Sequence, residues 1–328
     1  MLVTGGSGFI GGHVVDVLHR LGVQVTSFDL VRPNRELTGV RYVKGDIRDT
    51  SLLLSSMGES RLIVHLAGIS DISRCEDSPA VSDEVNLKAN RDLISAIPRV
   101  LRNRQTPLKV VFASSAAVYG VDSLSSYCES AVLGSTTSLY GQQKLESERV
   151  FLTRTQPSDG FSSVCLRLFN VYGPSSFGGA KSRSVVQRFS TAVSDHQSFT
   201  ISGTGEQVRD FIYVSDVVSA ILKVGFNHSN VNQLFNVGTG KGTSINALAD
   251  LFGALSAEPF ERHYTPSIAC GAFRSVADTQ LIRESINWKA DYDLSDGVSA
   301  VLSDSFAGTR SSFTVSSNSY PNNRMSRP

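Results

Sequence analysis

Short β-branched runs alternate along this chain with longer stretches of helical period, and this alternation constrains the fold more than any other feature. The runs read MLVT, VQVTSFD, RYVKGD, RLIVHLAG, KVVFASS, SVCLRLFNV and QLFNVG. Between the first two runs, apolar side chains recur at helical spacing at Ile10, Val14, Val17, Leu18 and Leu21. A second helix is predicted over Ser82–Arg102, with one apolar stripe of Val85, Ala89, Leu93, Ile97 and Leu101. The alternation predicts βαβ units and a mostly parallel sheet covered by helices.

The even alternation ends near Asn170. Beyond it, Gly- and Ser-rich loops mix with short strands and helices, which indicates a smaller domain interleaved with the first. The segment 309–328 is rich in Ser and Asn and has few periodic apolar positions, so it is predicted to be a disordered tail.

Charge and cysteine usage exclude several function classes. The 328 residues include 31 Lys and Arg against 30 Asp and Glu, so a net charge of +1 favours neither nucleic acid nor an anionic membrane as partner. No apolar run approaches the ~20 residues that span a bilayer, and the first residues lack a basic leader, so we expect a cytoplasmic protein. The cysteines Cys75, Cys128, Cys165 and Cys270 form no C-x-x-C pair, and no metal site is predicted.

The first chemical motif is GGSGFIGG, in which Gly5, Gly8 and Gly11 stand between a strand and a helix. Glycines let the backbone turn sharply and approach a pyrophosphate, whose charge is met by the N-terminal amides of the helix. Asp29 ends the next strand, where a carboxylate binds both hydroxyls of an adenosine ribose and repels a 2′-phosphate. The pattern predicts a dinucleotide site that favours NAD, although the nearby Arg32 would suit NADP.

The second motif is SLYGQQK, which places Tyr140 and Lys144 four residues apart in a helical segment. One turn of separation puts both side chains on the same helix face. A phenol with a pKa of about 10 is a poor base at neutral pH unless a nearby cation stabilises the phenolate. Lys144 is placed to supply that cation. We infer a site because the pair follows a nucleotide loop and a strand that ends in Ser114 and Ser115.

Seven segments follow one another in the order TGGSGFIGG, VHLAG, SSAAVYG, Y-x-x-x-K, LRLFNVYGP, RDFIYVSDVV and FNVGTG. Together they resemble the extended short-chain dehydrogenase/reductase family over about residues 1–300, and within it the nucleotide-sugar epimerases such as UDP-glucose 4-epimerase. The resemblance implies a Rossmann-type doubly wound parallel sheet, a smaller C-terminal α/β substrate domain, and a homodimer that packs two helices per subunit. The implied NAD-binding domain covers 1–169 plus about 209–238, and the implied nucleotide-sugar-binding domain about 170–208 plus 239–308.

The resemblance also assigns roles to residues. Ser115 would hydrogen-bond the reacting sugar hydroxyl, Tyr140 would be the base, and Lys144 would hold the nicotinamide ribose and lower the pKa of the tyrosine. NAD would be bound by Gly5, Gly8, Phe9, Ile10, Gly11, Asp29, Asp46, Ile47, Leu66, Ala67, Gly68, Tyr140 and Lys144. The nucleotide sugar would be bound by Ser115, Asn170, Arg209, Arg274 and Ser275, because a guanidinium suits a diphosphate. Without that role, Arg209 would pair with Asp210 or Asp216.

The two alanines after Ser115 bear on the reaction. Relatives in this family that eliminate water carry Asp-Glu where this chain has Ala116 and Ala117, because elimination needs an acid and a base. The resemblance therefore implies 4-epimerisation: Tyr140 takes the proton of the 4-hydroxyl, hydride passes from C4 to bound NAD, and it returns to the other face of the rotated 4-keto sugar.

Several alternatives stay open at this point. The substrate could be a UDP-hexose, a UDP-N-acetylhexosamine, a UDP-hexuronic acid or the sugar of a different nucleotide, and the small Ser275 could admit an N-acetyl group. A dehydratase, a decarboxylase or a reductase of the same family is another outcome. A non-catalytic NAD-sensing regulator is a third, against which the presence of Ser115, Tyr140 and Lys144 argues.

Overall fold

A computed structural model gives the fold. It describes residues 1–102, 104, 106–120, 125–131, 138–155, 160–174, 184–227, 231–256, 260–266 and 272–306. The predicted tail, 309–328, lies outside the described residues. No helix among those described is both long and apolar enough to cross a membrane.

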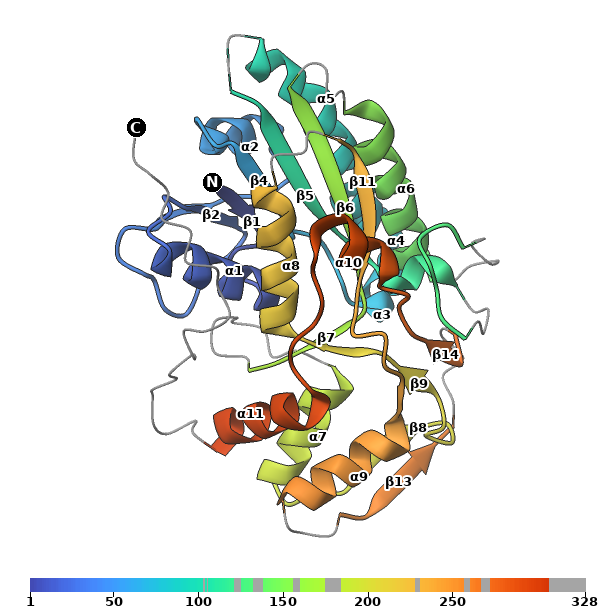
Figure 1. The fold of residues 1–328 in the computed structure, drawn as a ribbon. Coiled ribbons are helices and arrows are strands. Elements are labelled where there is room, and N and C mark those ends of the chain that lie inside the picture. Colours follow the sequence, from blue (N-terminus) through green and yellow to red (C-terminus); the bar gives the residue numbers. More distant parts are fainter. Residues whose placement is uncertain are drawn as a thin grey trace.

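A seven-stranded parallel sheet forms the centre of the molecule (Figure 1). Its strands lie in the order β3, β2, β1, β4, β5, β6, β11. They span Leu2–Thr4 (β1), Thr26–Asp29 (β2), Arg41–Lys44 (β3), Leu62–His65 (β4), Leu108–Ser115 (β5), Phe161–Leu168 (β6) and Gln233–Val237 (β11). Each predicted run supplies one of them, and the predicted Rossmann-type fold is confirmed. The chain reverses its direction of winding between β1 and β4, and doubly wound sheets bind ligands outside the carboxyl ends of their strands at such a point.

Helices cover both faces of the sheet. One face packs against α1 (Phe9–Arg20), α8 (Val214–Phe226) and α10 (Gln280–Ile286), and the other against α2 (Thr50–Met57), α5 (Ala89–Leu101) and α6 (Leu139–Arg154). Successive strand residues alternate between the two cores, as Leu2 and Val3 do in β1. Because both faces are buried, the strands read in sequence as continuous apolar runs.

The predicted second helix is longer and less regular than its apolar stripe indicates. It begins with α4 (Pro79–Asp83), continues through a π-helical turn at Glu84–Lys88, and ends with α5. A short helix, α3 (Ile72–Asp77), precedes it. The buried stripe was predicted correctly, but the π turn was not, because the apolar spacing of α5 is unaffected by it.

The run SVCLRLFNV was predicted as one strand, and the structure divides it into two. β6 ends at Leu168, and β7 (Asn170–Tyr172) pairs with β10 (Phe211–Tyr213) in a separate parallel pair. Between them, the Phe169 amide donates to the Val237 carbonyl at 3.0 Å, and the Asn170 amide to the Asp210 carbonyl at 3.1 Å. The chain therefore leaves the central sheet after Phe169, where its hydrogen-bond partner changes from Val237 to Asp210.

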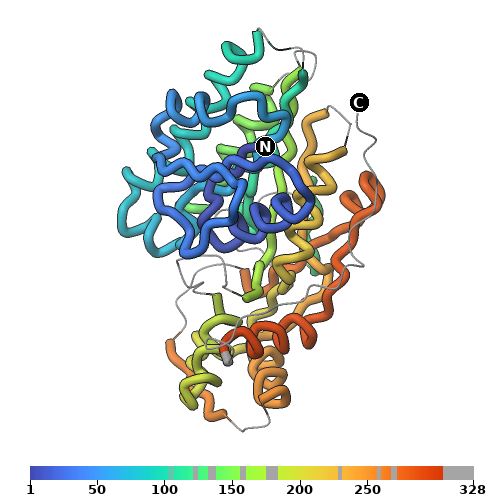
Figure 2. Tube along the Cα trace, turned by 90° about the vertical axis from the view of Figure 1, so that its left-hand side faces the viewer, coloured from blue at the N-terminus to red at the C-terminus, as the bar shows by residue number. Residues whose placement is uncertain are grey.

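A second group of elements lies below the sheet in Figure 1 and is separate from it in the turned view of Figure 2. Its core is lined by aromatic residues such as Phe189, Phe199 and Phe252. It comprises α7 (Val185–Ser194), α9 (Ile245–Ser256), α11 (Leu294–Phe306), the pair β8 (Phe199–Ser202) and β13 (Arg262–Thr265), and the three short strands β9 (Val208–Arg209), β12 (Thr243–Ser244) and β14 (Arg274–Ser275). Within the chain after β11, Ile282 and Trp288 pack in the core of the sheet instead. The domain bounds given above stay a prediction.

Candidate active site

The predicted cofactor and catalytic residues lie at one edge of the central sheet. Gly5 follows β1, Asp29 ends β2, Asp46 follows β3, Leu66 follows β4, and Ser115 ends β5. In a parallel sheet these carboxyl ends meet at the same edge, so five separate strands bring their terminal residues together.

The glycine loop packs so closely that side chains would not fit. Gly5 has a φ of +69°, and a Cβ on it would lie 2.8 Å from the Ala67 nitrogen. A Cβ on Gly11 would lie 1.9 Å from the Gly5 carbonyl oxygen. The N-cap of α1 is Gly8, which makes no side-chain capping bond, so no side chain there satisfies the first amides of the helix. This cradle of glycine backbone at a helix N-terminus fits the pyrophosphate of a dinucleotide.

The Asp29 carboxylate is held in place at the loop. It accepts hydrogen bonds from the Ser7 amide at 3.0 Å and the Val31 amide at 3.2 Å, and the residue is half-exposed. Arg32 pairs with Glu36 at 2.5 Å. The fixed carboxylate fits the ribose hydroxyls of NAD.

Asp46 and Ile47 reach the same edge from β3. The Arg48 side chain bonds both Asp46 oxygens, and this contact lowers the pKa of Asp46. Ile47 is buried. Within the described part of the chain, no hydrogen bond joins either residue to the glycine loop, so their contribution to cofactor binding stays a prediction.

Tyr140 and Lys144 lie on one face of α6, as their spacing predicts, and Ser115 lies close to them. The Ser115 side chain lies close enough to the Tyr140 hydroxyl to favour its ionised form, and the Lys144 ammonium lies 5.8 Å from the centre of the Tyr140 ring. Lys144 Nζ donates to the Ala113 carbonyl at 2.8 Å, which anchors it to β5. Tyr140 stands in the first turn of α6, which is capped by the Ser138 hydroxyl. The positive end of the helix dipole therefore favours negative charge at the tyrosine.

Burial sets the protonation of this pair. It raises the pKa of Tyr140 to about 12, although the hydrogen bond from Ser115 opposes the shift. It lowers the pKa of Lys144 to about 8. At neutral pH the tyrosine is therefore protonated and the lysine is mostly charged, so proton abstraction by Tyr140 needs further positive charge close to its oxygen.

The other predicted sugar-nucleotide residues lie on β7, β9 and β14. The Asn170 amide group donates to the Asp210 carbonyl at 3.1 Å. Arg209 on β9 faces Ser275 on β14 in the strand register. Arg274, one residue earlier, donates to the Ser125 carbonyl at 2.8 Å.

Arg209 makes no ion pair with any described carboxylate. The two candidate partners are occupied: Asp210 accepts bonds from Thr239 and Gly240, and Asp216 from the Tyr292 amide. The Arg209 guanidinium donates to the Val208 carbonyl, and burial lowers the pKa of Arg209. A half-buried cation with no anionic partner among the described residues is available for a diphosphate.

Sequence reasoning missed a buried histidine beneath this edge. His65 Nδ1 lies 2.7 Å from the Thr4 hydroxyl, and Nε2 lies 2.7 Å from the Asn90 side-chain oxygen. Because that oxygen can only accept, Nε2 carries the proton and Thr4 donates to Nδ1. Thr4 in turn accepts from the Ala67 amide at 3.3 Å. The signal was present, since a histidine inside a run as apolar as RLIVHLAG must find partners within the core.

The π turn supplies a second missed group, Asn86. Its side-chain oxygen accepts from the Ile69 amide at 2.8 Å, and its nitrogen donates to Gln143 at 2.9 Å. Gln143 donates onward to Ser82 and Asp83, both at 2.8 Å. These bonds tie the loop that follows β4 to α6, one residue before Lys144. No local pattern predicts them, because they depend on the register of the π turn.

His65 leads to a prediction about stability. Burial lowers the pKa of His65 to about 4 in the folded protein, from an ordinary value of 6.5. The unfolded chain therefore binds this proton more readily, and folding stability is lost as the pH falls from about 6.5 to about 4, by about 3 kcal/mol from this group. Urea unfolding at several pH values measures the free energy of unfolding. The wild type should lose this additional stability between pH 6.5 and about 4, and His65→Asn should not. His263→Asn, at an exposed position on β13, is the control, and an equal pH dependence in all three proteins would contradict the prediction.

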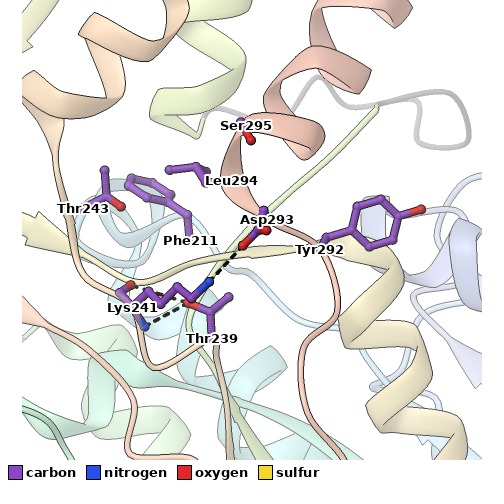
Figure 3. Close-up of a pocket in the computed structure, with 8 residues that line it drawn as sticks. All are labelled: Phe211, Thr239, Lys241, Thr243, Tyr292, Asp293, Leu294 and Ser295. Atoms are coloured by element: carbon purple, nitrogen blue, oxygen red, sulfur yellow. Dashed lines mark hydrogen bonds and ion pairs between the residues drawn. The ribbon is translucent and has the colours of Figure 1, made fainter.

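A cavity of about 280 Å³ lies beside Arg209, whose register partner Thr243 is one of its lining residues (Figure 3). It is lined by Phe211, Thr239, Lys241, Thr243, Tyr292, Asp293, Leu294 and Ser295, and the ion pair of Lys241 and Asp293 crosses it at 2.9 Å. None of the predicted site residues lines it. Over the described ranges, no three His, Cys, Asp or Glu side chains gather as metal ligands.

The chain is similar to known proteins in sequence and in fold. Residues 1–238 match the NAD dependent epimerase/dehydratase family. A putative UDP-glucose 4-epimerase of Methanocaldococcus jannaschii is 30% identical over 307 residues, which cover 92% of this chain and 97% of the relative. The structure of MoeE5 in complex with UDP-glucose and NAD superposes with a TM-score of 0.83 at 26% identity, covering 93% of this chain and 98% of that one. The UDP-N-acetylglucosamine 4-epimerase of Methanobrevibacter ruminantium, in complex with UDP-N-acetylmuramic acid, gives 0.83 at 28% identity, over 93% and 97%.

Proposed function

Because the chain belongs to the NAD-dependent epimerase/dehydratase family, we propose that it catalyses the 4-epimerisation of a nucleoside-diphosphate sugar, a UDP-hexose or UDP-N-acetylhexosamine. The observation that carries the proposal is the cluster of Ser115, Tyr140 and Lys144 at the same sheet edge as the glycine cradle. NAD, when bound, supplies a hydride acceptor and donor and a positively charged ring, and the net redox change is zero.

The protein's own residues then have distinct tasks. Tyr140 removes the proton of the sugar 4-hydroxyl and later returns one, while Ser115 hydrogen-bonds the same hydroxyl. Lys144 stabilises the tyrosinate through its charge. Arg209, which lacks a described anionic partner, binds the diphosphate with Asn170, and the linkage between phosphate and sugar is left free to rotate. This freedom is what lets both faces of the keto sugar be reduced.

The two alanines argue against the related eliminations. Ala116 and Ala117 form the 3₁₀ turn that follows Ser115, and the Ser115 oxygen accepts from the Ala117 amide at 3.2 Å. Their methyl groups cannot transfer a proton, so a dehydratase or decarboxylase that uses an acid here is disfavoured. A reductase would consume NADH, and a regulator would bind NAD without turnover.

One assay separates these outcomes. The purified protein is incubated with UDP-glucose, UDP-N-acetylglucosamine or UDP-glucuronic acid and catalytic NAD, while proton NMR follows the sugar and absorbance follows NADH. We expect the C4 epimer of one substrate class without net NADH. Loss of water, release of carbon dioxide or stoichiometric NADH consumption would replace the proposal with the corresponding alternative.

We also propose a cytoplasmic homodimer that packs through α5 and α6. The helices lie side by side and are joined by a hydrogen bond of 3.0 Å from Asn90 to Ser147. The cytoplasmic location is supported by Cys75 and Cys165, which are buried free thiols, as is usual in reducing compartments. The outward side chains are polar or charged, among them Arg91, Asp92, Arg99, Gln142 and Arg149. A dimer held by such a face should dissociate at high salt. Sedimentation at low and high salt should show dimer and then monomer, and a monomer under both conditions would refute the interface.

A further inference from the structure

A buried carboxylate lies directly behind the catalytic residues. Glu148 stands on α6, one turn after Lys144 and two turns after Tyr140, and its side chain is 3% exposed. It accepts a hydrogen bond of 2.5 Å from the hydroxyl of Ser114, the residue before Ser115. Glu148 therefore joins the helix that carries the base to the strand end that carries the serine.

Arg167 on β6 holds this carboxylate in place. Its Nε and Nη2 atoms donate to the two Glu148 oxygens at 2.9 and 2.8 Å, and its side chain is 4% exposed. The guanidinium lies 4.7 Å from the centre of the Tyr119 ring and donates to the Glu129 carbonyl at 3.2 Å. The ion pair thus packs beneath the turn that begins at Ser115.

Stability alone does not account for this pair. Burying two charges costs so much desolvation that apolar residues of the same size often serve a core as well or better. Glu148 also bonds Ser114, the residue next to Ser115, and Arg167 holds that carboxylate with two bonds. The arrangement is therefore placed to act on the site.

We propose that Glu148, oriented by Arg167, is a positioning residue that fixes Lys144 and Ser115 relative to each other and supplies the buried negative charge that keeps Lys144 protonated. The proposal rests on the function proposed above for Lys144. Glu148 touches neither substrate nor cofactor in this role and acts through its neighbours.

The groups around Lys144 support an electrostatic role for Glu148. Burial lowers the pKa of Lys144, and the Glu148 charge opposes that shift. The other titratable groups that face the ammonium are Tyr140 on its own helix, His65 on β4, Cys165 on β6 and Cys75 on α3. Burial keeps each of them uncharged near pH 8, because it raises the pKa of the tyrosine and the two thiols and lowers that of the histidine. Glu148 is the anion among these described groups.

The test measures the titration of Lys144 in ligand-free protein, so its result does not depend on which reaction the enzyme catalyses. The ¹⁵Nζ resonance of Lys144, assigned with Lys144→Arg, is followed against pH in the wild type and Glu148→Gln. We expect the midpoint to fall by about one pH unit or more when the charge is removed. The alkaline limb of kcat/KM should move by the same amount, while NAD affinity stays within a few fold.

Two further variants keep the proposal testable. Glu146→Gln removes an exposed carboxylate from the same helix and should leave the Lys144 midpoint unchanged. Glu148→Asp keeps the charge and should titrate Lys144 close to the wild-type midpoint even if Glu148→Gln does not fold. An unchanged midpoint in Glu148→Gln would overturn the proposal, as would an Asp variant that shifts by about one pH unit.

Discussion

Tyr140→Phe is expected to lower kcat by about 1,000-fold, which is the usual contribution of a positioned acid or base. The substitution removes one oxygen that lies near Ser115 and leaves the ring that packs near Lys144. The glycine loop and Asp29 are untouched, so NAD should bind within a few fold of its wild-type affinity. Steady-state kinetics and NAD titration measure the two effects separately.

Tyr213→Phe provides the matched control. Tyr213 is buried to the same degree as Tyr140, 7% against 8% exposed, and lies in the core of the second group of elements. Removing its hydroxyl should leave kcat nearly unchanged. If Tyr140→Phe kept wild-type turnover, Tyr140 would not be the base and the proposed mechanism would be wrong.

Gly11→Ala is expected to damage both the fold and the cofactor site. The added carbon would lie 1.9 Å from the Gly5 oxygen, 2.7 Å from the Gly5 carbonyl carbon and 2.9 Å from the Gly6 Cα, all of which are backbone atoms. Overpacking of this kind costs about 1–3 kcal/mol of unfolding free energy. Since the same atoms form the pyrophosphate cradle, NAD affinity should fall by about tenfold or more, which corresponds to about 1.4 kcal/mol. Urea unfolding and calorimetric titration measure these losses.

Gly8→Ala is the control for the loss of stability in Gly11→Ala, because it adds the same methyl group to the loop without the severe backbone clash. Gly8 has an extended backbone with a φ of −78°, and a Cβ there would lie 3.1 Å from its nearest neighbour, the Gly5 oxygen. Its unfolding free energy should stay within about 1 kcal/mol of the wild type. Equal stability of the Gly11 variant and the wild type would show that the loop can move apart, which would contradict the tight cradle.

The sheet could be predicted from the sequence because strands buried on both faces need apolar side chains at every position. The same continuity hid the break at Phe169, where an apolar residue continues the run while the backbone changes partners. The spacing of Tyr140 and Lys144 was informative because a helix turn places them on one face. Glu148 extends that face by one more turn. Its role could not be predicted, because it depends on the contact with Arg167, which is distant in the sequence.

Other parts of the site have no local signal. Arg209 and Ser275 are opposite each other because β9 and β14 pair over a long sequence separation. The freedom of Arg209 depends on Asp210 and Asp216 finding other partners, which requires the positions of Thr239 and Tyr292. Contacts of this kind follow from the whole fold, so motif reading could name the residues but could not place them.

The last strand of the sheet, β11, completes the site late during synthesis of the chain. Asn236 on β11 accepts from the Tyr119 hydroxyl at 2.6 Å and donates to the Tyr127 carbonyl at 2.7 Å. Until β11 leaves the ribosome, the edge of β6 is an unpaired strand and the turn after Ser115 lacks this brace. A nascent chain that already holds every glycine of the cradle and both Tyr140 and Lys144 is thus still without a finished site. The site is complete only after β11 has been synthesised and has paired with β6, and a product that ends before β11 leaves the edge of β6 open to aggregation.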